Sequence, residues 1–527
     1  MAQIRMETGL KEKRKIREKY ILWAAYGVLF LCFAVTRIYM LDRLPAGLHV
    51  DEASMSYSAW CLANYGVDRY LDSWPVYLVN FTGGQSIMYA YLCALLFKIF
   101  GYNIWLIRMP AALFSLLTLV FGIKAAQRIK PEDSFFPLFI GLLITVCPYF
   151  IMAARFGLDC NLMLGMSTVF LYFVIKALQE KRWQDYLCAG IAGGLTLYTY
   201  ALSYVAVPIF LVLLLLYVLG SRSFSLKNWA IMALPMALLA FPLILVQCVN
   251  AFDWPEMRLG IFTITKMSTY RASEFTGIKY VYFQQALNCL FENDSFRYNM
   301  APGYKTLYGI SKYLFCIGIF GGIYDLIQSI RKKAAGGLTV ILLWFVSILF
   351  LECHLIANVN KLNGIYFAYA VLAAEGVCVL CRLCRHAVIS KCVIGVFVCA
   401  YIGLFADFSH YYYGGAYMQK AAPLQYFGCN ISEAIEFLEA QPNLRNKLTR
   451  IGGNAVFYAA STLQSPYELA LYDEPECIGG KYYCGDVEEI EDGYNYIIWG
   501  EALAFADELT GKGYTGLSFG DYALYYQ

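Results

Sequence analysis

Two adjacent carboxylates, Asp51 and Glu52, follow the first long apolar segment of the chain. Pro45 and Gly47 interrupt any helix before them, and a new apolar-rich stretch, residues 54–65, comes directly after them. In this position Asp51 could be the N-cap of a new helix, with Glu52 favoured by the positive end of the helix dipole. Alternatively, an acidic pair at a membrane surface can act as a general base or as an ion ligand. One carboxylate can do both, so the sequence leaves the two interpretations open.

A second pair with chemical potential is Arg155 and Asp159, which follow an apolar run that begins near Pro148. The two residues are four apart, so on a continuing helix they share one face. They could form a surface ion pair, which is usually worth less than about 1 kcal/mol. They could also be an anion-binding Arg and a second acidic group that faces Asp51. The planar fork of donors on Arg suits a phosphate.

The composition indicates the environment in which these residues lie. Hydrophobic residues make up 60% of the 527 residues and charged residues only 15%, whereas soluble domains have about 25% charged residues. Several long apolar runs therefore predict a multi-pass membrane protein. The net charge of +3 gives no indication of a nucleic-acid partner, and we expect none. The sequence contains no phosphate-binding P-loop, no HExxH motif and no dinucleotide fingerprint.

The distribution of basic residues predicts the sidedness of the chain. A basic stretch over residues 11–19 precedes the first apolar run, so the N-terminus is expected in the cytoplasm and Asp51 on the outer face. Residues 86–97 are too few to cross a bilayer and are expected to form a helix in the outer interface. Basic residues at 124–130 are then cytoplasmic. About eleven spans are predicted, at residues 20–40, 110–126, 135–152, 162–178, 186–200, 205–219, 229–249, 311–330, 338–353, 363–380 and 392–407.

The chain changes character after residue 410. We expect a transmembrane domain over residues 1–410, whose outer loop 42–109 carries the acidic pair, and a small extracytoplasmic α/β domain over residues 411–527. In the second domain, residues 432–439 and 502–509 have helix patterns, and residues 496–499 and 523–526 have strand patterns. This region forms either a domain or a partial one that completes its core on the membrane part. Cys477 and Cys484 either form a disulfide or are free thiols.

Two short motifs resemble a known superfamily. The segment from Gly47 to Ala53, with Pro75 and Gly84-Gln85 downstream, is similar to bacterial members of the GT-C superfamily, the multi-spanning glycosyltransferases that use polyprenyl-phosphate sugars. The Asp-Glu pair resembles the first outer loop of protein O-mannosyltransferases. Residues 148–159 resemble the second outer loop of aminoarabinose transferases. The resemblance extends in architecture over roughly residues 20–400, and it implies an all-α, GT-C-like polytopic fold.

The resemblance also implies roles for individual residues. Asp51 matches the catalytic acidic residue, with Glu52 as its partner that orients the acceptor or a metal, and Asp159 matches the second acidic position. Arg155 would bind the donor phosphate. Lys361 lies where relatives often place a basic residue before a late span, although relatives have Arg there and an Arg-Tyr pair is missing here.

The activity implied by the resemblance is transfer of a hexose or pentose from a polyprenyl-phosphate donor to an acceptor hydroxyl, with inversion, at the outer face of the cell membrane. The acceptor would be a cell-envelope glycan, a lipid or a protein. Asp51, Glu52 and Asp159 are candidate ligands for Mg²⁺ or Mn²⁺, although some relatives need no metal. The alternative is a transporter or flippase, whose acidic groups would lie within the spans, where Asp325 and Glu375 are the main acidic residues. A non-catalytic scaffold or sensor is a second alternative.

Overall fold

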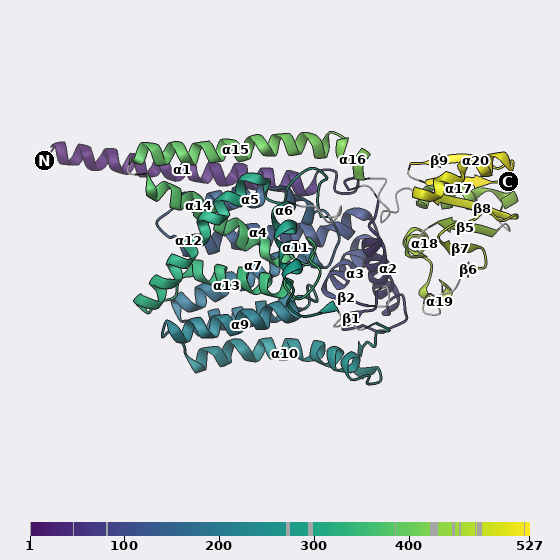
Figure 1. Cartoon of the computed structure of the whole chain (residues 1–527), viewed down its shortest axis with the longest axis horizontal. Coiled ribbons are helices and arrows are strands. Elements are labelled where there is room, and N and C mark those ends of the chain that lie inside the picture. Colours follow the sequence, from purple (N-terminus) through teal and green to yellow (C-terminus); the bar gives the residue numbers. More distant parts are fainter. Residues whose placement is uncertain are drawn as a thin grey trace.

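The fold is built from helices that run alongside one another. The computed structural model describes residues 2–45, 47–80, 83–269, 274–292, 299–384, 386–421, 431–444, 448–452, 455–469, 471, 477–520 and 522–527. Within these residues, eleven helices of the bundle run along the long axis of the molecule (Figure 1). They are α1 (Ala2–Ile38), α4 (Ile104–Ile129), α5 (Phe135–Val146), α7 (Cys160–Glu180), α8 (Trp183–Leu197), α9 (Ser203–Gly220), α10 (Leu226–Ala251), α12 (Tyr308–Lys332), α13 (Gly337–Glu352), α14 (Tyr366–Leu383) and α15 (Ala387–Tyr413). Each of the predicted apolar runs therefore contains one of these helices.

The number of spans stays a prediction. Among the described residues, eight helices are long and apolar enough to cross a membrane. The remaining three, α5, α8 and α13, have 12, 15 and 16 residues. The predicted span at residues 135–152 is split, because α5 ends before Pro148, where α6 (Pro148–Ala153) begins. Proline lacks an N–H and disrupts the preceding turn of a helix, which accounts for the break.

Short elements gather at the end of the bundle opposite to the N-terminus (Figure 1). They are α2 (Val50–Tyr65), β1 (Tyr77–Leu78), β2 (Gln85–Ser86), α3 (Met88–Phe100), β3 (Met257–Leu259), β4 (Phe262–Ile264), α11 (Tyr280–Phe291) and a 3-10 turn (Asn363–Ile365). β1 and β2 pair antiparallel, as do β3 and β4. The segment before β1 is held to β4, because Val76 N–H donates to Thr263 O over 2.9 Å. The predicted interfacial helix at residues 86–97 is α3, which packs on α2.

The chain after α15 forms a mixed sheet beyond this end of the bundle (Figure 1). Six strands lie in the order β6-β7-β5-β8-β10-β9, and β5 is parallel to both of its neighbours. The strands are β5 (Leu448–Gly452), β6 (Cys477–Ile478), β7 (Tyr482–Gly485), β8 (Tyr494–Trp499), β9 (Thr515–Phe519) and β10 (Tyr522–Tyr526). The helices are α16 (Ala416–Ala421), α17 (Ile431–Ala440), α18 (Ala455–Thr462), α19 (Pro466–Leu469) and α20 (Ala506–Gly511), with 3-10 turns at Pro442–Leu444 and Gly500–Phe505.

The sheet region shares a hydrophobic core with the membrane part. Ala53, Tyr57 and Cys61 on one face of α2 pack in the same buried cluster as α17, α18 and the sheet. The Tyr57 hydroxyl donates to Gln464 O over 2.8 Å. The predicted helix at 432–439 and both predicted strands are present, whereas residues 502–509 are a 3-10 turn followed by α20. Cys477 and Cys484 are free thiols.

Candidate active site

One cavity brings together three of the five residues that the sequence singled out. Asp51, Asp159 and Lys361 all line a cavity of about 450 Å³ at the α2 end of the bundle. Its remaining wall combines polar and apolar side chains, from Tyr77, Asn80, Gly84, Gln85, Leu158, Cys160, Tyr200, Ala201, Leu202, Tyr204, Val205, Gln247, Met267, Glu274, Phe275 and Asn360. A site with three carboxylates, one ammonium group and a largely apolar wall is suited to a ligand that is part polar and part hydrocarbon.

Asp51 reaches the cavity because it does not cap its helix. α2 begins at Val50, and its N-cap is His49, whose Nδ1 accepts a hydrogen bond from Asp51 N–H over 3.1 Å. The interpretation of Asp51 as the N-cap is therefore wrong. Burial lowers the pKa of His49, so the ring is neutral near pH 7, and the 3.6 Å approach of Asp51 Oδ2 to it is not an ion pair. The Asp51 side chain is 36% exposed, and the helix N-terminus favours its negative charge.

Asp159 is held by backbone groups on both of its oxygens. Oδ1 accepts from Cys160 N–H over 2.9 Å, at the start of α7, and Oδ2 accepts from Ser86 N–H over 3.0 Å, at the end of β2. The side chain is 9% exposed. These bonds fix the carboxylate between two elements that are 73 residues apart in sequence, so Asp159 is a rigid acceptor at the cavity wall.

Lys361 is the positively charged side chain of the cavity wall, among the residues that the structure describes. Its Nζ lies 3.0 Å from Glu274 Oε2, and its side chain is 20% exposed. The backbone N–H of Lys361 donates to Asn358 Oδ1 over 2.9 Å. An anion in the cavity can compete with Glu274 for this ammonium group.

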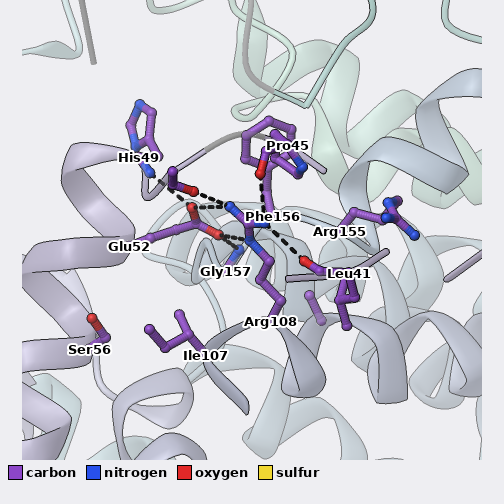
Figure 2. A network of polar contacts seen from close by, with 12 residues as sticks. Leu41, Pro45, His49, Glu52, Ser56, Ile107, Arg108, Arg155, Phe156 and Gly157 are labelled. Carbon is purple, nitrogen blue, oxygen red and sulfur yellow. Dashed lines mark hydrogen bonds and ion pairs between the residues drawn. The ribbon is translucent and has the colours of Figure 1, made fainter. Parts of the chain in front are cut away.

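Glu52 is not among the residues that line the cavity, and its carboxylate points into a buried polar network around Arg108 (Figure 2). Its side chain is fully buried and accepts four N–H groups: two from Arg108, at 3.1 and 3.2 Å, one from Gly157 at 2.5 Å and one from His49 at 2.9 Å. Glycine at position 157 allows this close approach, because a Cβ there would lie only 3.1 Å from both Glu52 Oε1 and Ile107 O. Glu52 therefore ties three segments together directly behind Asp51.

Arg108, which the sequence analysis did not single out, is the centre of this network. It lies near the start of α4, is fully buried, and also donates to Leu41 O, Pro45 O and Gly47 O at 2.9, 2.8 and 2.5 Å. These bonds hold the segment that leads from α1 to α2. The sequence did contain a signal for this role, because Arg108 is a lone Arg within an apolar run. Arg is almost never fully buried unless it is paired, so such a residue predicts a buried carboxylate partner.

Arg155 also holds the chain near the end of α1 through hydrogen bonds to backbone carbonyls. Its guanidinium is fully buried and donates to the carbonyls of Thr36, Tyr39, Met40 and Leu44 over 2.8–3.1 Å. It also donates to the Tyr412 hydroxyl at the end of α15 over 3.1 Å.

The expectation that Arg155 and Asp159 share a helix face is wrong. α6 ends at Ala153 and α7 begins at Cys160, so no helix joins the two residues. The structure places Arg155 outside the set of residues that line the cavity, with its donors directed at backbone oxygens. A phosphate-binding role for Arg155 has no support in this geometry.

The three carboxylates suggested as metal ligands do not converge. Glu52 is turned toward Arg108, while Asp51 and Asp159 line the cavity. Within the described ranges of the chain, no group of three or more His, Cys, Asp or Glu side chains is arranged to hold a metal ion. The set Asp51, Glu52 and Asp159 therefore does not fit a divalent cation.

Comparisons with known proteins agree with this architecture. Residues 84–246 match the family model for dolichyl-phosphate-mannose-protein mannosyltransferases. The chain is 26% identical over 180 residues to the lipopolysaccharide core galacturonosyltransferase RgtA of Rhizobium johnstonii, a match that covers 33% of each protein. The match thus spans about a third of the length of that relative.

Two crystal structures of ArnT from Cupriavidus metallidurans share the fold over most of the chain. The structure bound to undecaprenyl phosphate has a TM-score of 0.57 at 12% identity and covers 95% of this chain and 97% of its own. The apo structure has the same TM-score at 14% identity and covers 95% and 98%. These two structures confirm the fold that the GT-C resemblance implied. The resemblance to GT-C glycosyltransferases, which the two motifs indicated, is also found in the family-model match over residues 84–246 and in the match to RgtA.

Proposed function

We propose that this protein is a membrane glycosyltransferase that moves a sugar from a polyprenyl-phosphate donor to an acceptor hydroxyl. The observation that carries the proposal is the cavity in which a carboxylate at a helix N-terminus, Asp51, shares the wall with a lysine ammonium group, Lys361. The match to a mannosyltransferase family model over residues 84–246, and the ArnT fold, support it.

In the proposed reaction, Asp51 is the general base. Its carboxylate takes the proton of the acceptor hydroxyl as the oxygen attacks the anomeric carbon. The bond between that carbon and the phosphate oxygen breaks, and the polyprenyl phosphate leaves with the electron pair. Attack from the face opposite to the leaving group inverts the anomeric configuration. Asp159, whose orientation is fixed by two backbone N–H groups, accepts from a hydroxyl of the bound sugar.

Negative charge grows on the leaving phosphate, and Lys361 is placed to stabilise it. The apolar part of the wall, which includes Leu202, Val205 and Met267, suits the first isoprene units of the donor. In this proposal the cavity end of the bundle faces outward and the N-terminus lies in the cytoplasm. Residues 1–410 are then the transferase domain, and residues 411–527 are an extracytoplasmic domain that is docked on α2.

The decisive test uses purified protein in lipid nanodiscs with a panel of radiolabelled polyprenyl-phosphate hexoses and pentoses and a membrane extract as acceptor. The proposal predicts release of polyprenyl phosphate and label in an acceptor fraction for at least one donor. The Asp51→Asn variant, prepared in parallel, reports background hydrolysis. The same protein reconstituted into vesicles provides the opposing readout: movement of intact labelled lipid across the vesicle membrane, with no bond cleavage, would indicate a flippase and overturn the proposal.

A further inference from the structure

Asn80 is a buried amide at the edge of the cavity beside the proposed base. It comes two residues after β1, is 5% exposed and lines the cavity together with Asp51 and Gln85. Neither its type nor its spacing drew attention in the sequence. A buried amide at a cavity wall must satisfy both of its ends, so its partners show which end faces the ligand.

The partners of Asn80 fix the orientation of its amide. The oxygen, Oδ1, accepts from the Arg69 guanidinium over 2.8 Å and from the Ser54 hydroxyl over 2.5 Å. A flipped amide would point its NH₂ group at the Arg69 donors, which excludes that orientation. The NH₂ group is consequently directed at the opposite side, where Nδ2 lies 3.4 Å from Asp51 Oδ1 and 3.2 Å from Gln85 Oε1.

Arg69 is itself held rigidly. It is 1% exposed, donates to the Ser54 hydroxyl and lies over the Tyr70 ring at 4.7 Å. The chain of contacts therefore runs from a buried guanidinium, through the carbonyl end of one amide, to the carboxylate at the start of α2.

We infer that Asn80 is a positioning residue for Asp51, and that Arg69 sets its orientation. The inference rests on the proposed function, in which Asp51 is the base. An N–H donor at one carboxylate oxygen favours the ionised form and leaves the other oxygen directed toward the acceptor hydroxyl. Asn80 thus orients the carboxylate of the base.

The test is the Asn80→Asp variant, which has nearly the same shape. It keeps an oxygen for Arg69 and Ser54 but replaces the NH₂ group with a second acidic oxygen beside Asp51. Protonation of the base then becomes easier, so the acid limb of the pH profile of kcat/KM moves up by about one pH unit or more. Below that limb, activity falls about tenfold per pH unit, while the KM for the donor stays within about twofold.

Asn64→Asp is the matched control, because Asn64 is an exposed residue on the same helix as Asp51, and its acid limb stays in place. Asn80→Ala is the second variant if Asn80→Asp does not fold. It removes the donor without adding charge, and the limb moves in the same direction by less. If Asn80 had a purely structural role, its substitutions would lower the melting temperature and the active fraction of the enzyme, and the acid limb of the pH profile would not move.

The outcomes separate this inference from the proposed function. An inactive Asp51→Asn enzyme together with an unmoved limb in the Asn80 variants overturns the inference and leaves the proposed function intact. A fully active Asp51→Asn enzyme overturns both. A moved limb in Asn80→Asp, with none in Asn64→Asp, supports the positioning role.

Discussion

Replacement of Glu52 by Gln should damage the fold far more than its position beside the proposed base suggests. The Glu52 carboxylate is fully buried and accepts four N–H groups, two of them from Arg108 (Figure 2). Gln keeps the shape, but its NH₂ end would face N–H donors. Arg108 would also lose the one carboxylate that forms an ion pair with it among the residues that the structure describes.

Removal of one partner of a buried ion pair costs about 3–5 kcal/mol. That loss is a large share of the roughly 5–15 kcal/mol by which proteins are typically stable. An unfolding entropy of about 2.1 cal/mol/K per residue over 527 residues gives a shift of about 1 °C per kcal/mol, so the melting temperature should fall by about 3–5 °C. Thermal unfolding in detergent, followed by intrinsic fluorescence, measures the shift. Turnover per folded molecule at low temperature should change much less.

The matched control is Glu491→Gln, which breaks a partly exposed ion pair of 2.6 Å to Arg450. Exposed pairs contribute about 0–1 kcal/mol, so its melting temperature should hardly move. The double variant Glu52→Gln with Arg108→Gln should lose less than the sum of the two single variants, because no unpaired buried charge remains. An unchanged melting temperature with lost turnover in Glu52→Gln would refute this reasoning and assign Glu52 to the substrate.

Three further predictions concern separate parts of the molecule. Burial raises the pKa of Asp68 to about 6, and burial with the charge of Asp68 raises that of Asp72 to about 8. Ionisation of these groups therefore opposes folding, and stability falls as the pH rises from about 4 toward these values. Asp68→Asn should flatten the decline in melting temperature between pH 4 and pH 6, and an unchanged pH slope would contradict this. Lys361→Met should raise the donor KM at least tenfold, whereas Arg155→Lys should lower the melting temperature with donor KM nearly unchanged; the reverse pattern, from steady-state kinetics and thermal scans, would restore Arg155 as the phosphate ligand. Cysteines introduced into the β3–β4 hairpin, but not into the loop after α12, should react with an impermeant thiol reagent on intact cells, and the opposite labelling would invert the topology.

Much of the fold could be predicted from the sequence, because hydrophobic runs of sufficient length specify membrane helices locally. The short helix α3 and the sheet region after α15 also follow from local patterns. The break between α6 and α7 was missed, since it involves contacts with distant segments, such as Gly157 N–H to Glu52 Oε1. The local pattern around Pro148 and Asp159 alone resembled one helix.

The candidate site was predicted only in part, because some of its contacts join residues that are far apart in the sequence. Asp51, Asp159 and Lys361 were found from residue type and resemblance, and they line one cavity. Arg108 was missed, because its carboxylate partner lies 56 residues earlier in the chain.

The choice of N-cap was also missed. His is not among the favoured N-cap residues, and the sequence therefore favoured Asp51. Only the fold shows that His49 caps α2, which releases Asp51 for the cavity.

The measurement that tests the central claim most directly compares the Asp51→Asn variant with the wild type, in both sugar transfer and melting temperature. General-base catalysis contributes about 10²- to 10⁴-fold, so kcat should fall by that factor when the carboxylate becomes an amide. The melting temperature should not change, because His49 and not Asp51 caps the helix. Turnover within a few-fold of the wild type, at an unchanged melting temperature, would contradict the account and move the base assignment to Asp159.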